Sequence, residues 1–581
     1  MKTKLSPKDV LFRFCFSFFF LFFYIFPMSV CLAEEQDGRI VVTADDIKKM
    51  QAIRVSDVLN QVPGVNAGDT SVSIHGSYKV KVFVDNRPIN DPTSSHGGVR
   101  WDLVSLENVE KIEILRGKGA IRYGNDAGGG VILITTRKIS ELSGNVNTYG
   151  GNYGTGSISA NSRIVKEGFG GAVSAAYDIT DGYAENNDKT IWRGGLKTEY
   201  ALAGENSVTV TADHAEDDRG YNGTRKYPTP FSRGESTMTS FSLLSKICGF
   251  NTKTYYNDGW KHNTDTSKNL DNELDVTYAG QEISSGFDMG GWGSLNTGAT
   301  FEWGKADGDA IDGKEENDIS LFAVQSFEIK GLPVSFTAGF RAGFHSEFDD
   351  SLNPELKALW RNPFADVSLS YSRSSNTPSF HQRYNETSST RPNPDLDMET
   401  AENYGISFSR KILPELSGSA TLFYNEIKDR ITYVRDDDGI GQYVNFGKVT
   451  YKGGDVSLNW KPFKKFSIKA SYTYLEAKDE ETGQWVTAKA KHKANAEMYY
   501  TPIDRLSLIL GVETSSKVYT TSSNSDWVPG YTLLNIRCEY AAMDGVRVFS
   551  EIKNAMDKTY YYADDSPAPP LMWILGVGYS F

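Results

Sequence analysis

The sequence predicts an all-β transmembrane barrel of about 22 antiparallel strands, with a small α/β domain inside its lumen. Three observations favour this fold. The chain of 581 residues is 12% aromatic and contains 54 Gly. Apolar and polar residues alternate along its C-terminal four-fifths, and the connections between alternating segments are short and long by turns. After residue 33, no run approaches the ~20 consecutive apolar residues of a transmembrane helix.

Residues 1–33 have the pattern of a secretory signal peptide. Lys2 and Lys4 belong to a positively charged start, an apolar block runs from Phe14 to Phe26, and small residues precede Glu34. We expect cleavage before Glu34. Two other interpretations stay open, an uncleaved membrane anchor and a lipoprotein anchor at Cys31.

Charge and cysteine content exclude several classes of protein. The whole chain has a formal charge of −13, and the signal carries four basic residues and one acid, so the mature chain has −16. This charge does not suit a nucleic-acid binder, which needs a basic surface. Two cysteines leave with the signal, and we expect Cys248 and Cys538, far apart in sequence, to be isolated thiols.

Residues 34–138 have the mixed pattern of a compact α/β domain. Thr43 is placed to cap a short helix with Asp46 at its third position. Residues 55–62 look like a second short helix, which Pro63-Gly64 ends. Short apolar runs predict strands at 72–74, 80–85, 109–115 and 131–135.

Residues 139–581 have the period-two alternation of strands with one apolar and one polar face. The segment from Phe466 to Tyr474 is an example, with Ser, Lys and Thr between apolar residues. Short connections such as 361–363, 461–465 and 543–545 alternate with long polar ones such as 373–398 and 557–570. Periplasmic turns and external loops of outer-membrane barrels differ in this way. A barrel this wide has a lumen that needs a plug.

The last strand supports a closed barrel in lipid. Trp573, Leu575, Val577 and Tyr579 would all face one side, and the chain ends in the aromatic Phe581. An apolar face with aromatic residues near its ends suits the membrane interface. Closure removes the unpaired strand edges that lipid would penalise.

The chain resembles the TonB-dependent outer-membrane receptors, whose plug domain residues 34–138 match. The strongest match is the run from Val109 to Gly117, which continues through Tyr123-Gly124 to Thr136. In the barrel, Asn393-Pro394-Asp395-Leu396 and Gly453-Gly454-Asp455 resemble two further family motifs. The resemblance covers nearly all of the mature chain. The chain is also similar in size to members of the vitamin B12 receptor branch. It implies a plug at 34–138 and a 22-stranded barrel at 139–581.

The chain departs from the family at positions that seat the plug. An arginine of the family pattern is His75 here, and a barrel acid is Gly405. In the family, two plug arginines face two barrel acids. We therefore expect that only Arg116 and Asp455 still pair, and a separation beyond about 6 Å would reject this pairing. The alternative is that each of the two side chains meets water in the lumen.

The resemblance also suggests a TonB-coupling segment and a partner. Members carry an extended N-terminal box that adds as a strand to TonB. The segment similar to it consists of Ile40, Val41, Val42, Thr43 and Ala44. This segment runs directly into Asp45-Asp46-Ile47, where the family has its first plug strand and helix. It is therefore either the coupling box or a structural strand, and the sequence leaves both readings open.

The resemblance places ligand on the outward-facing plug loops. The matching loop runs from 90 to 101 and combines hydrogen-bonding groups, a guanidinium suited to an anion and an aromatic ring. Its candidate ligand residues are Asp91, Thr93, Ser94, Ser95, His96, Arg100 and Trp101. The alternative is a loop that contacts only water. His381 and Tyr384, in the long connection 373–398, are weaker candidates.

Metal sites have little support in the sequence. Clustered carboxylates near two early strand ends could bind calcium, although their spacing matches no EF-hand: Asp178, Asp181, Glu185, Asp188, Asp217 and Asp218. No His pair has the spacing of a zinc site. Gly117, Gly119 and Gly124 form no phosphate-binding loop. We expect no resident cofactor, with loop-bound calcium as the open alternative.

The sequence as a whole predicts an importer and not an enzyme. We expect a monomeric outer-membrane transporter, driven through TonB and its inner-membrane complex, that carries a scarce metal chelate, a ferric siderophore first. Cobalamin and heme are the alternatives within the family. A non-energised channel or binding receptor is the alternative from another class. An enzyme of the outer membrane would need an aligned catalytic group, and none stands out.

Overall fold

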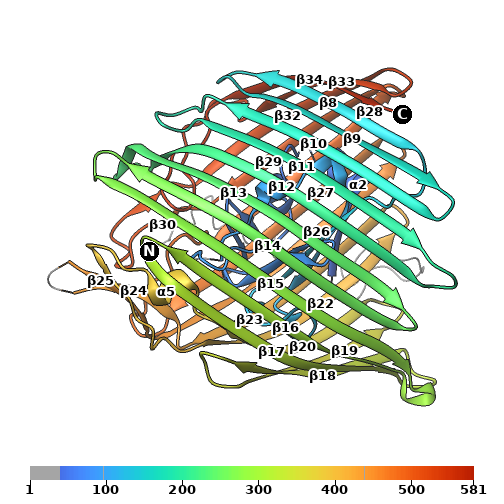
Figure 1. Cartoon of the computed structure of the whole chain (residues 1–581). Coiled ribbons are helices and arrows are strands. Elements are labelled where there is room, and N and C mark those ends of the chain that lie inside the picture. The colour runs from blue at the N-terminus through green and yellow to red at the C-terminus, as the bar shows by residue number, and fades with distance from the viewer. Residues whose placement is uncertain (1–38, 51, 96, 437–438) are drawn as a thin grey trace, which may run out of the picture.

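The computed structural model describes residues 39–50, 52–95, 97–436 and 439–581. Its main element is a closed barrel of 22 antiparallel strands, and the N-terminal domain lies inside the ring (Figure 1). The predicted fold class is therefore confirmed. The signal peptide expected at 1–33 lies outside the described residues. No helix in the part of the chain that the structure describes is long and apolar enough to span a membrane.

The plug is a small α/β domain around one five-stranded sheet. The sheet order is β1-β6-β7-β4-β5, with β4 and β7 parallel. The elements of the plug are β1 (Arg39–Thr43), α2 (Ala44–Lys49), α3 (Val55–Asn60), β2 (Val65–Ala67), β3 (Val72–Ile74), β4 (Val80–Val84), β5 (Arg87–Pro88), η2 (Trp101–Leu103), η3 (Leu106–Asn108), β6 (Val109–Arg116), α4 (Ala120–Tyr123) and β7 (Gly130–Thr136).

Local sequence signals explain these elements. Thr43 caps α2, because its side chain accepts from the Asp46 amide while the Asp46 carboxylate accepts from the Thr43 amide. The alternating residues Ile112 and Ile114 of β6 pack with Ile132 and Ile134 of β7, and all four are fully buried. These contacts form the centre of the plug core, whose hydrophobic burial holds the domain together.

The first thirteen strands of the barrel include the longest ones. They are β8 (Ser143–Gly151), β9 (Gly156–Lys166), β10 (Phe169–Thr180), β11 (Lys189–Ala201), β12 (Ser207–Gly223), β13 (Pro228–Ile247), β14 (Phe250–Asp265), β15 (Leu270–Asp288), β16 (Ser294–Gly308), β17 (Ile311–Glu328), β18 (Val334–His345), β19 (Ser351–Arg361) and β20 (Asp366–Asn376). A short 3-10 helix, η4 (Gly290–Trp292), lies in the connection between β15 and β16.

The second half completes the ring. Its strands are β22 (Glu399–Leu413), β23 (Leu416–Lys428), β26 (Lys448–Phe463), β27 (Phe466–Asp479), β28 (His492–Ile503), β29 (Leu506–Ser515), β32 (Tyr531–Met543), β33 (Val546–Lys553) and β34 (Met572–Ser580). Long connections hold further elements: α5 (Phe380–Tyr384), β21 (Thr390–Arg391), β24 (Ile431–Arg435), β25 (Gly441–Asn445), β30 (Val518–Tyr519) and β31 (Trp527–Val528). The sequence predicts a plain loop where β24 and β25 form a hairpin.

The two rims of the barrel differ as the sequence predicts. One rim, the turn rim, has short connections such as 167–168, 464–465 and 504–505. The opposite rim, the loop rim, has long ones, which include 377–398, 516–530 and 554–571. The barrel closes where β34 pairs with β8, from Ile574↔Gly151 to Ser580↔Asn145.

Candidate functional site: the cavity between plug and barrel

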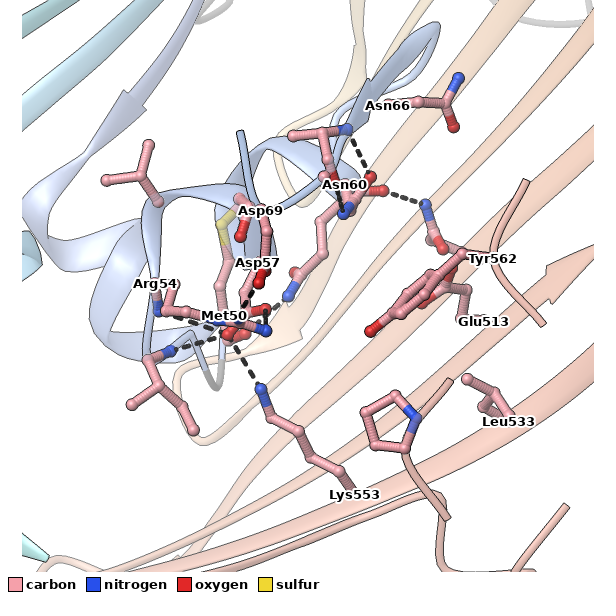
Figure 2. Close-up of a pocket in the computed structure, with 18 of the residues that line it drawn as sticks. Met50, Arg54, Asp57, Asn60, Asn66, Asp69, Glu513, Leu533, Lys553 and Tyr562 are labelled. Carbon is pink, nitrogen blue, oxygen red and sulfur yellow. Dashed lines mark hydrogen bonds and ion pairs between the residues drawn. The ribbon is translucent and has the colours of Figure 1, made fainter. Parts of the chain in front are cut away.

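A cavity of about 1050 Å³ lies between one side of the plug and the barrel wall. Its lining extends from Tyr562 in the 554–571 connection at the loop rim to Lys469 near the turn rim. Figure 2 shows its central part, where α3 and the plug segment that follows it face β29, β32 and β33. This volume is at the upper end of the range for small-molecule sites.

A network of charges joins the plug to the wall of this cavity. Arg54 Nη1 lies 2.8 Å from Asp69 Oδ1, and Lys189 Nζ of β11 lies 3.5 Å from Asp69 Oδ2. Lys553 Nζ of β33 donates to Asp57 Oδ2 over 2.9 Å (Figure 2). Burial raises the pKa of Asp57, but the charges of Lys553 and Arg54 outweigh this effect and lower that pKa to about 2. Both carboxylates therefore stay ionised, and Lys189 is the largest cause of the lowered pKa of Asp69.

A second group of contacts holds the same plug segment through uncharged oxygens. Lys493 Nζ of β28 donates to Asn66 Oδ1 over 3.0 Å, and to Asn60 Oδ1 and the Val65 carbonyl over 3.3 Å. Asn495 Nδ2 donates to the Asn60 carbonyl over 3.0 Å. The segment from α3 to β2 is therefore bound to the wall by both ion pairs and hydrogen bonds.

Tyrosines line the cavity near the loop rim. The rings of Tyr531 and Tyr560 have centroids 4.7 Å apart, and those of Tyr560 and Tyr562 are 6.1 Å apart. The Tyr183 hydroxyl donates to the Pro567 carbonyl over 3.0 Å. Burial raises the pKa of Tyr183 to about 12, so that it stays a neutral phenol. These side chains give the mouth of the cavity flat apolar faces with hydroxyl groups at their edges.

Three connections are clasped together over this mouth. Arg225, between β12 and β13, has its Nε 3.0 Å from Asp565 Oδ1 and its Nη2 3.5 Å from Asp526 Oδ2. Lys226 Nζ lies 2.8 Å from the same Asp526 carboxylate. Asp526 and Asp565 belong to the connections 516–530 and 554–571, so two basic residues draw both of these loops toward the opposite wall.

The predicted ligand loop contributes little to the cavity. Asp91 pairs with Lys261 of β14 and accepts from the Thr93 hydroxyl over 2.6 Å. Arg100 is buried and binds Asp102 through Nε at 3.0 Å and Nη2 at 2.6 Å. Asp102 therefore already neutralises the guanidinium, and the role of Arg100 in ligand binding stays a prediction.

Trp101 is the member of that loop that lines the cavity. Its Nε1–H is buried and has no hydrogen-bond partner within the described part of the chain. Ser94 and Ser95 lie in the same loop and are not among the lining residues. His96 lies outside the described residues. The sequence missed the charged residues Arg54, Asp57 and Asp69, but the Tyr560-Tyr561-Tyr562 run in a long connection was a usable signal.

The segment from Ile40 to Ala44 is part of the plug. Ile40, Val41, Val42 and Thr43 belong to β1, which pairs with β6, and Ala44 is the first residue of α2. Val42 is buried in the plug core. The interpretation of these residues as a free coupling box is therefore wrong for this structure, because their backbone is paired along one side. β1 is nevertheless an edge strand of the sheet.

Asp455 is the barrel residue to which the plug is bound near β6. Arg116 Nη1 lies 2.7 Å from Asp455 Oδ2, well within the 6 Å limit set above. His75 Nε2 lies 2.6 Å from the same oxygen, and the Thr473 hydroxyl donates to Asp455 Oδ1 over 2.8 Å. The idea that only Arg116 pairs with Asp455 is thus wrong, because His75 contacts it as well. The His75 ring also stacks on Phe423 at 3.6 Å.

The carboxylates considered for calcium are largely paired with arginine. Asp178 pairs with Arg193, and Asp217 pairs with Arg219. Asp188 and Asp218 both lie 2.8 Å from Arg233 Nη2. Within the described residues, no group of three or more His, Cys, Asp or Glu side chains could hold a metal ion. Cys248 and Cys538 are both free thiols, as predicted.

A closed barrel with a domain lodged in its lumen, and a cavity between the two beneath clasped loops, defines a plugged-barrel receptor. The family model "TonB dependent receptor-like, beta-barrel" matches residues 130–555, and "TonB-dependent Receptor Plug Domain" matches residues 33–131. The chain therefore belongs to the TonB-dependent receptor family.

Relatives and solved structures resemble the chain over most of its length. The iron-regulated outer membrane virulence protein of Vibrio cholerae is 24% identical, over 90% of this chain and 89% of that one. The vitamin B12 transporter BtuB of Photobacterium profundum is 22% identical, over 90% and 88%. The crystal structure of the siderophore receptor PirA from Acinetobacter baumannii has a TM-score of 0.79 at 16% identity, over 94% and 99%. At this identity, the likeness to PirA concerns the fold.

Proposed function

We propose that this protein imports a scarce metal chelate across the outer membrane of a Gram-negative bacterium, with work supplied through TonB. A ferric siderophore is the first candidate cargo, and cobalamin and heme are the alternatives. The observation that carries the proposal is the cavity of about 1050 Å³ beneath clasped loops, because it offers a ligand a site already half enclosed. The named relatives include both iron-regulated and vitamin B12 proteins.

The plug segment from α3 to β2 is the element that would have to move. It forms one side of the cavity, and polar contacts from Lys553 and Lys493 hold it against the wall, while Lys189 contacts Asp69 just after it. Ion pairs and hydrogen bonds of this kind separate at modest cost when water replaces them. The hydrophobic sheet of the plug need not unfold for the passage to widen.

The growth of a deletion strain tests the cargo. The strain is grown with single sources of iron, which are a panel of ferric chelates and heme, and separately under a requirement for cobalamin. We expect growth to fail on one ferric chelate and to return with the plasmid-borne gene. Failure on cobalamin or heme alone would identify the alternative, and unimpaired growth on every source would contradict the importer.

Energy coupling is a separate part of the proposal. Because β1 holds residues 40–43 in the plug sheet, we expect TonB to engage the chain upstream of β1. Capture of the full-length receptor by the periplasmic domain of TonB is compared with that of variants lacking 34–38 or 34–44. We expect loss of 34–38 alone to abolish capture and uptake, while ligand binding persists.

A non-energised binding receptor is the second candidate. The incorporation of residues 40–43 into β1 favours it, since this segment cannot serve as a free box in the same state. Uptake that continues in a strain without TonB, together with no capture of the full-length receptor by the TonB domain, would support this second candidate over the first.

A further inference from the structure

We infer that the cavity accepts a metal chelate of neutral or positive net charge, and not a trianionic catecholate complex. This inference rests on the proposed role as a chelate importer and specifies the class of cargo. Three features carry it: the balance of charged groups in the lining, the engagement of every lining cation, and the carboxylates that have no cation.

The lining of the cavity contains more acidic than basic residues. Twelve Asp and Glu side chains contribute to it, against eight Lys and Arg. Arginines just outside the lining pair with three of the acids, which are Asp102, Asp188 and Glu551. Four acids form no ion pair among the described residues: Glu107, Glu497, Glu513 and Asp564. Field lines concentrate in a cleft with low-dielectric walls, so an excess of one sign acts strongly on a charged ligand. An acidic lining attracts cations and repels anions before any contact forms.

The eight cations are already engaged. Arg54, Lys189 and Lys553 bind the plug carboxylates Asp69 and Asp57 at 2.8 to 3.5 Å. Arg116, Arg193, Arg219 and Lys469 are each paired with a carboxylate as well. Lys493 is the exception, and it donates instead to three oxygens of the plug. A trianion would have to break such pairs, and those of Arg219 and Arg116 would leave the buried carboxylates Asp217 and Asp455 without a cation, which is costly.

Several lining carboxylates, by contrast, have no such partner. Glu513 accepts from the Tyr531 hydroxyl over 3.1 Å, and Asp564 accepts from the Ser566 amide and hydroxyl. Neither forms an ion pair among the described residues. Glu551 differs from these two, because its Oε2 lies 3.3 Å from Arg537 Nη1, while its buried Oε1 accepts no hydrogen bond within the described part of the chain. These acceptors suit a cargo that brings its own N–H, O–H or ammonium donors.

The neighbouring aromatic groups agree with this assignment. Tyr531 and Tyr560 form a pair of rings, and the Tyr531 hydroxyl donates to Glu513. Burial and the nearby Glu513 charge raise the pKa of Tyr560, so this phenol stays uncharged. Uncharged rings attract cations through their faces. Trp101 adds a buried indole N–H without a partner. The groups named here that remain free are therefore carboxylate acceptors, hydroxyls, aromatic rings and one indole N–H, and none of them is a cation.

Binding to the full-length receptor in detergent tests the inference directly. The probes are a singly cationic ferric trihydroxamate, a neutral ferric trihydroxamate, a trianionic ferric tris-catecholate and cyanocobalamin. We expect the tightest ligand to be neutral or cationic and to bind at least about 100-fold more tightly than the tris-catecholate. If the tris-catecholate binds tightest, the charge inference is overturned while the importer proposal stands. If none of the four binds, the charge inference is overturned, and the growth panel above decides on the importer proposal.

A charge-neutralising variant probes the mechanism. The double substitution Glu513→Gln with Asp564→Asn should weaken binding of the cationic probe about tenfold and leave the neutral probe unchanged. Raising salt from about 0.05 M to about 0.5 M should reduce the difference. Asp349→Asn, an exposed carboxylate outside the cavity, is the matched control. Equal effects on the cationic and neutral probes, or no effect on either, would overturn the inference.

Discussion

At the scale of single residues, Asp455 decides how the plug is seated. It is 3% exposed and forms hydrogen bonds with His75, Arg116 and Thr473, so each of its two oxygens has a partner. The loss of a buried carboxylate that is paired in this way is destabilising, mainly because its partner is left as an uncompensated buried charge. Removing it strands Arg116 and leaves His75 without its acceptor.

We predict that Asp455→Asn weakens the attachment of the plug. The loss of one charge from a buried pair should lower the free energy of unfolding by about 3 kcal/mol. The midpoint of thermal unfolding in detergent measures this effect. Asp366→Asn, at the start of β20 near the turn rim, serves as a control that should change the midpoint little. Equal midpoints for both variants would show that the three contacts do not stabilise the plug.

A second residue-scale prediction concerns pH and Asp57. Its pKa in the folded protein is about 2, whereas an unfolded chain has about 3.9. A lowered folded-state pKa contributes stability that is present above about pH 4 and is lost as pH falls toward 2. The contribution at neutral pH is about 2 kcal/mol.

The variant Asp57→Asn isolates this contribution. We expect it to unfold at a lower temperature than the parent protein at pH 7, and the gap to shrink as the pH is lowered from about 4 to about 2. Thermal unfolding followed by circular dichroism at about pH 7 and at about pH 2 gives the difference in unfolding temperature between variant and parent at each pH. A gap that stays constant with pH would mean that the Lys553 and Arg54 charges do not act on Asp57.

At the scale of elements, the loops over the cavity are held by a small number of charges. Arg225 and Lys226 reach Asp526 and Asp565 from a connection on the opposite wall. Arg225, Lys226 and Asp526 are partly exposed, although Asp565 is buried, so each pair contributes little alone. Their importance lies in geometry, because they hold two long connections, 516–530 and 554–571, across the mouth.

We predict that Arg225→Glu releases these loops. A carboxylate at this position faces Asp526 and Asp565, and repulsion should replace attraction. Amide hydrogen exchange in 516–530 and 554–571 should accelerate several-fold, while exchange in β4 and β7 of the plug stays unchanged. Lys138→Glu, a similar charge reversal remote from the mouth, is the control. Unchanged exchange in the two loops would show that other contacts hold them.

At the scale of the whole molecule, the barrel is stabilised by closure. Every strand pairs on both sides, and the seam between β34 and β8 completes the ring. Its outer surface is apolar: Trp573 is 48% exposed and Leu575 is 56% exposed, whereas Ile574 between them is 4% exposed. Such a surface needs lipid, and lipid in turn penalises an unpaired strand edge.

We therefore predict that removal of residues 571–581 prevents folding. The deletion takes away β34 and leaves β33 and β8 with open edges. The shortened chain should show no compact, heat-sensitive band in gel electrophoresis after refolding into detergent. Deletion of residues 522 and 523 from the connection 516–530 at the loop rim serves as the control and should leave that band intact. A compact band for the shortened chain would contradict the role of closure.

The described elements show how far the sequence alone could lead. The strands predicted at 72–74, 80–85 and 109–115 agree with β3, β4 and β6 to within a residue, because period-two burial is a local signal. The alternation from Phe466 to Tyr474 likewise lies inside β27. The hairpin of β24 and β25 was missed, since its polar residues look like an ordinary loop.

The candidate site was predicted less well. The loop from 90 to 101 was chosen for its chemistry, yet Asp102 and Lys261 neutralise Arg100 and Asp91, and among the described candidates Trp101 alone lines the cavity. The pairs that form the cavity wall join residues nearly 500 positions apart, as Lys553 and Asp57 do. No local pattern indicates such a contact.

By itself, then, the sequence determined the barrel, the plug and the family, because alternation and short motifs record which face of each strand meets lipid or core. The tertiary structure alone decided where the cavity lies, which charges remain free in it, and that His75 joins Arg116 at Asp455. The physical reason is that ion pairing and enclosure depend on distances across the lumen. These distances are fixed only when the ring closes around the plug.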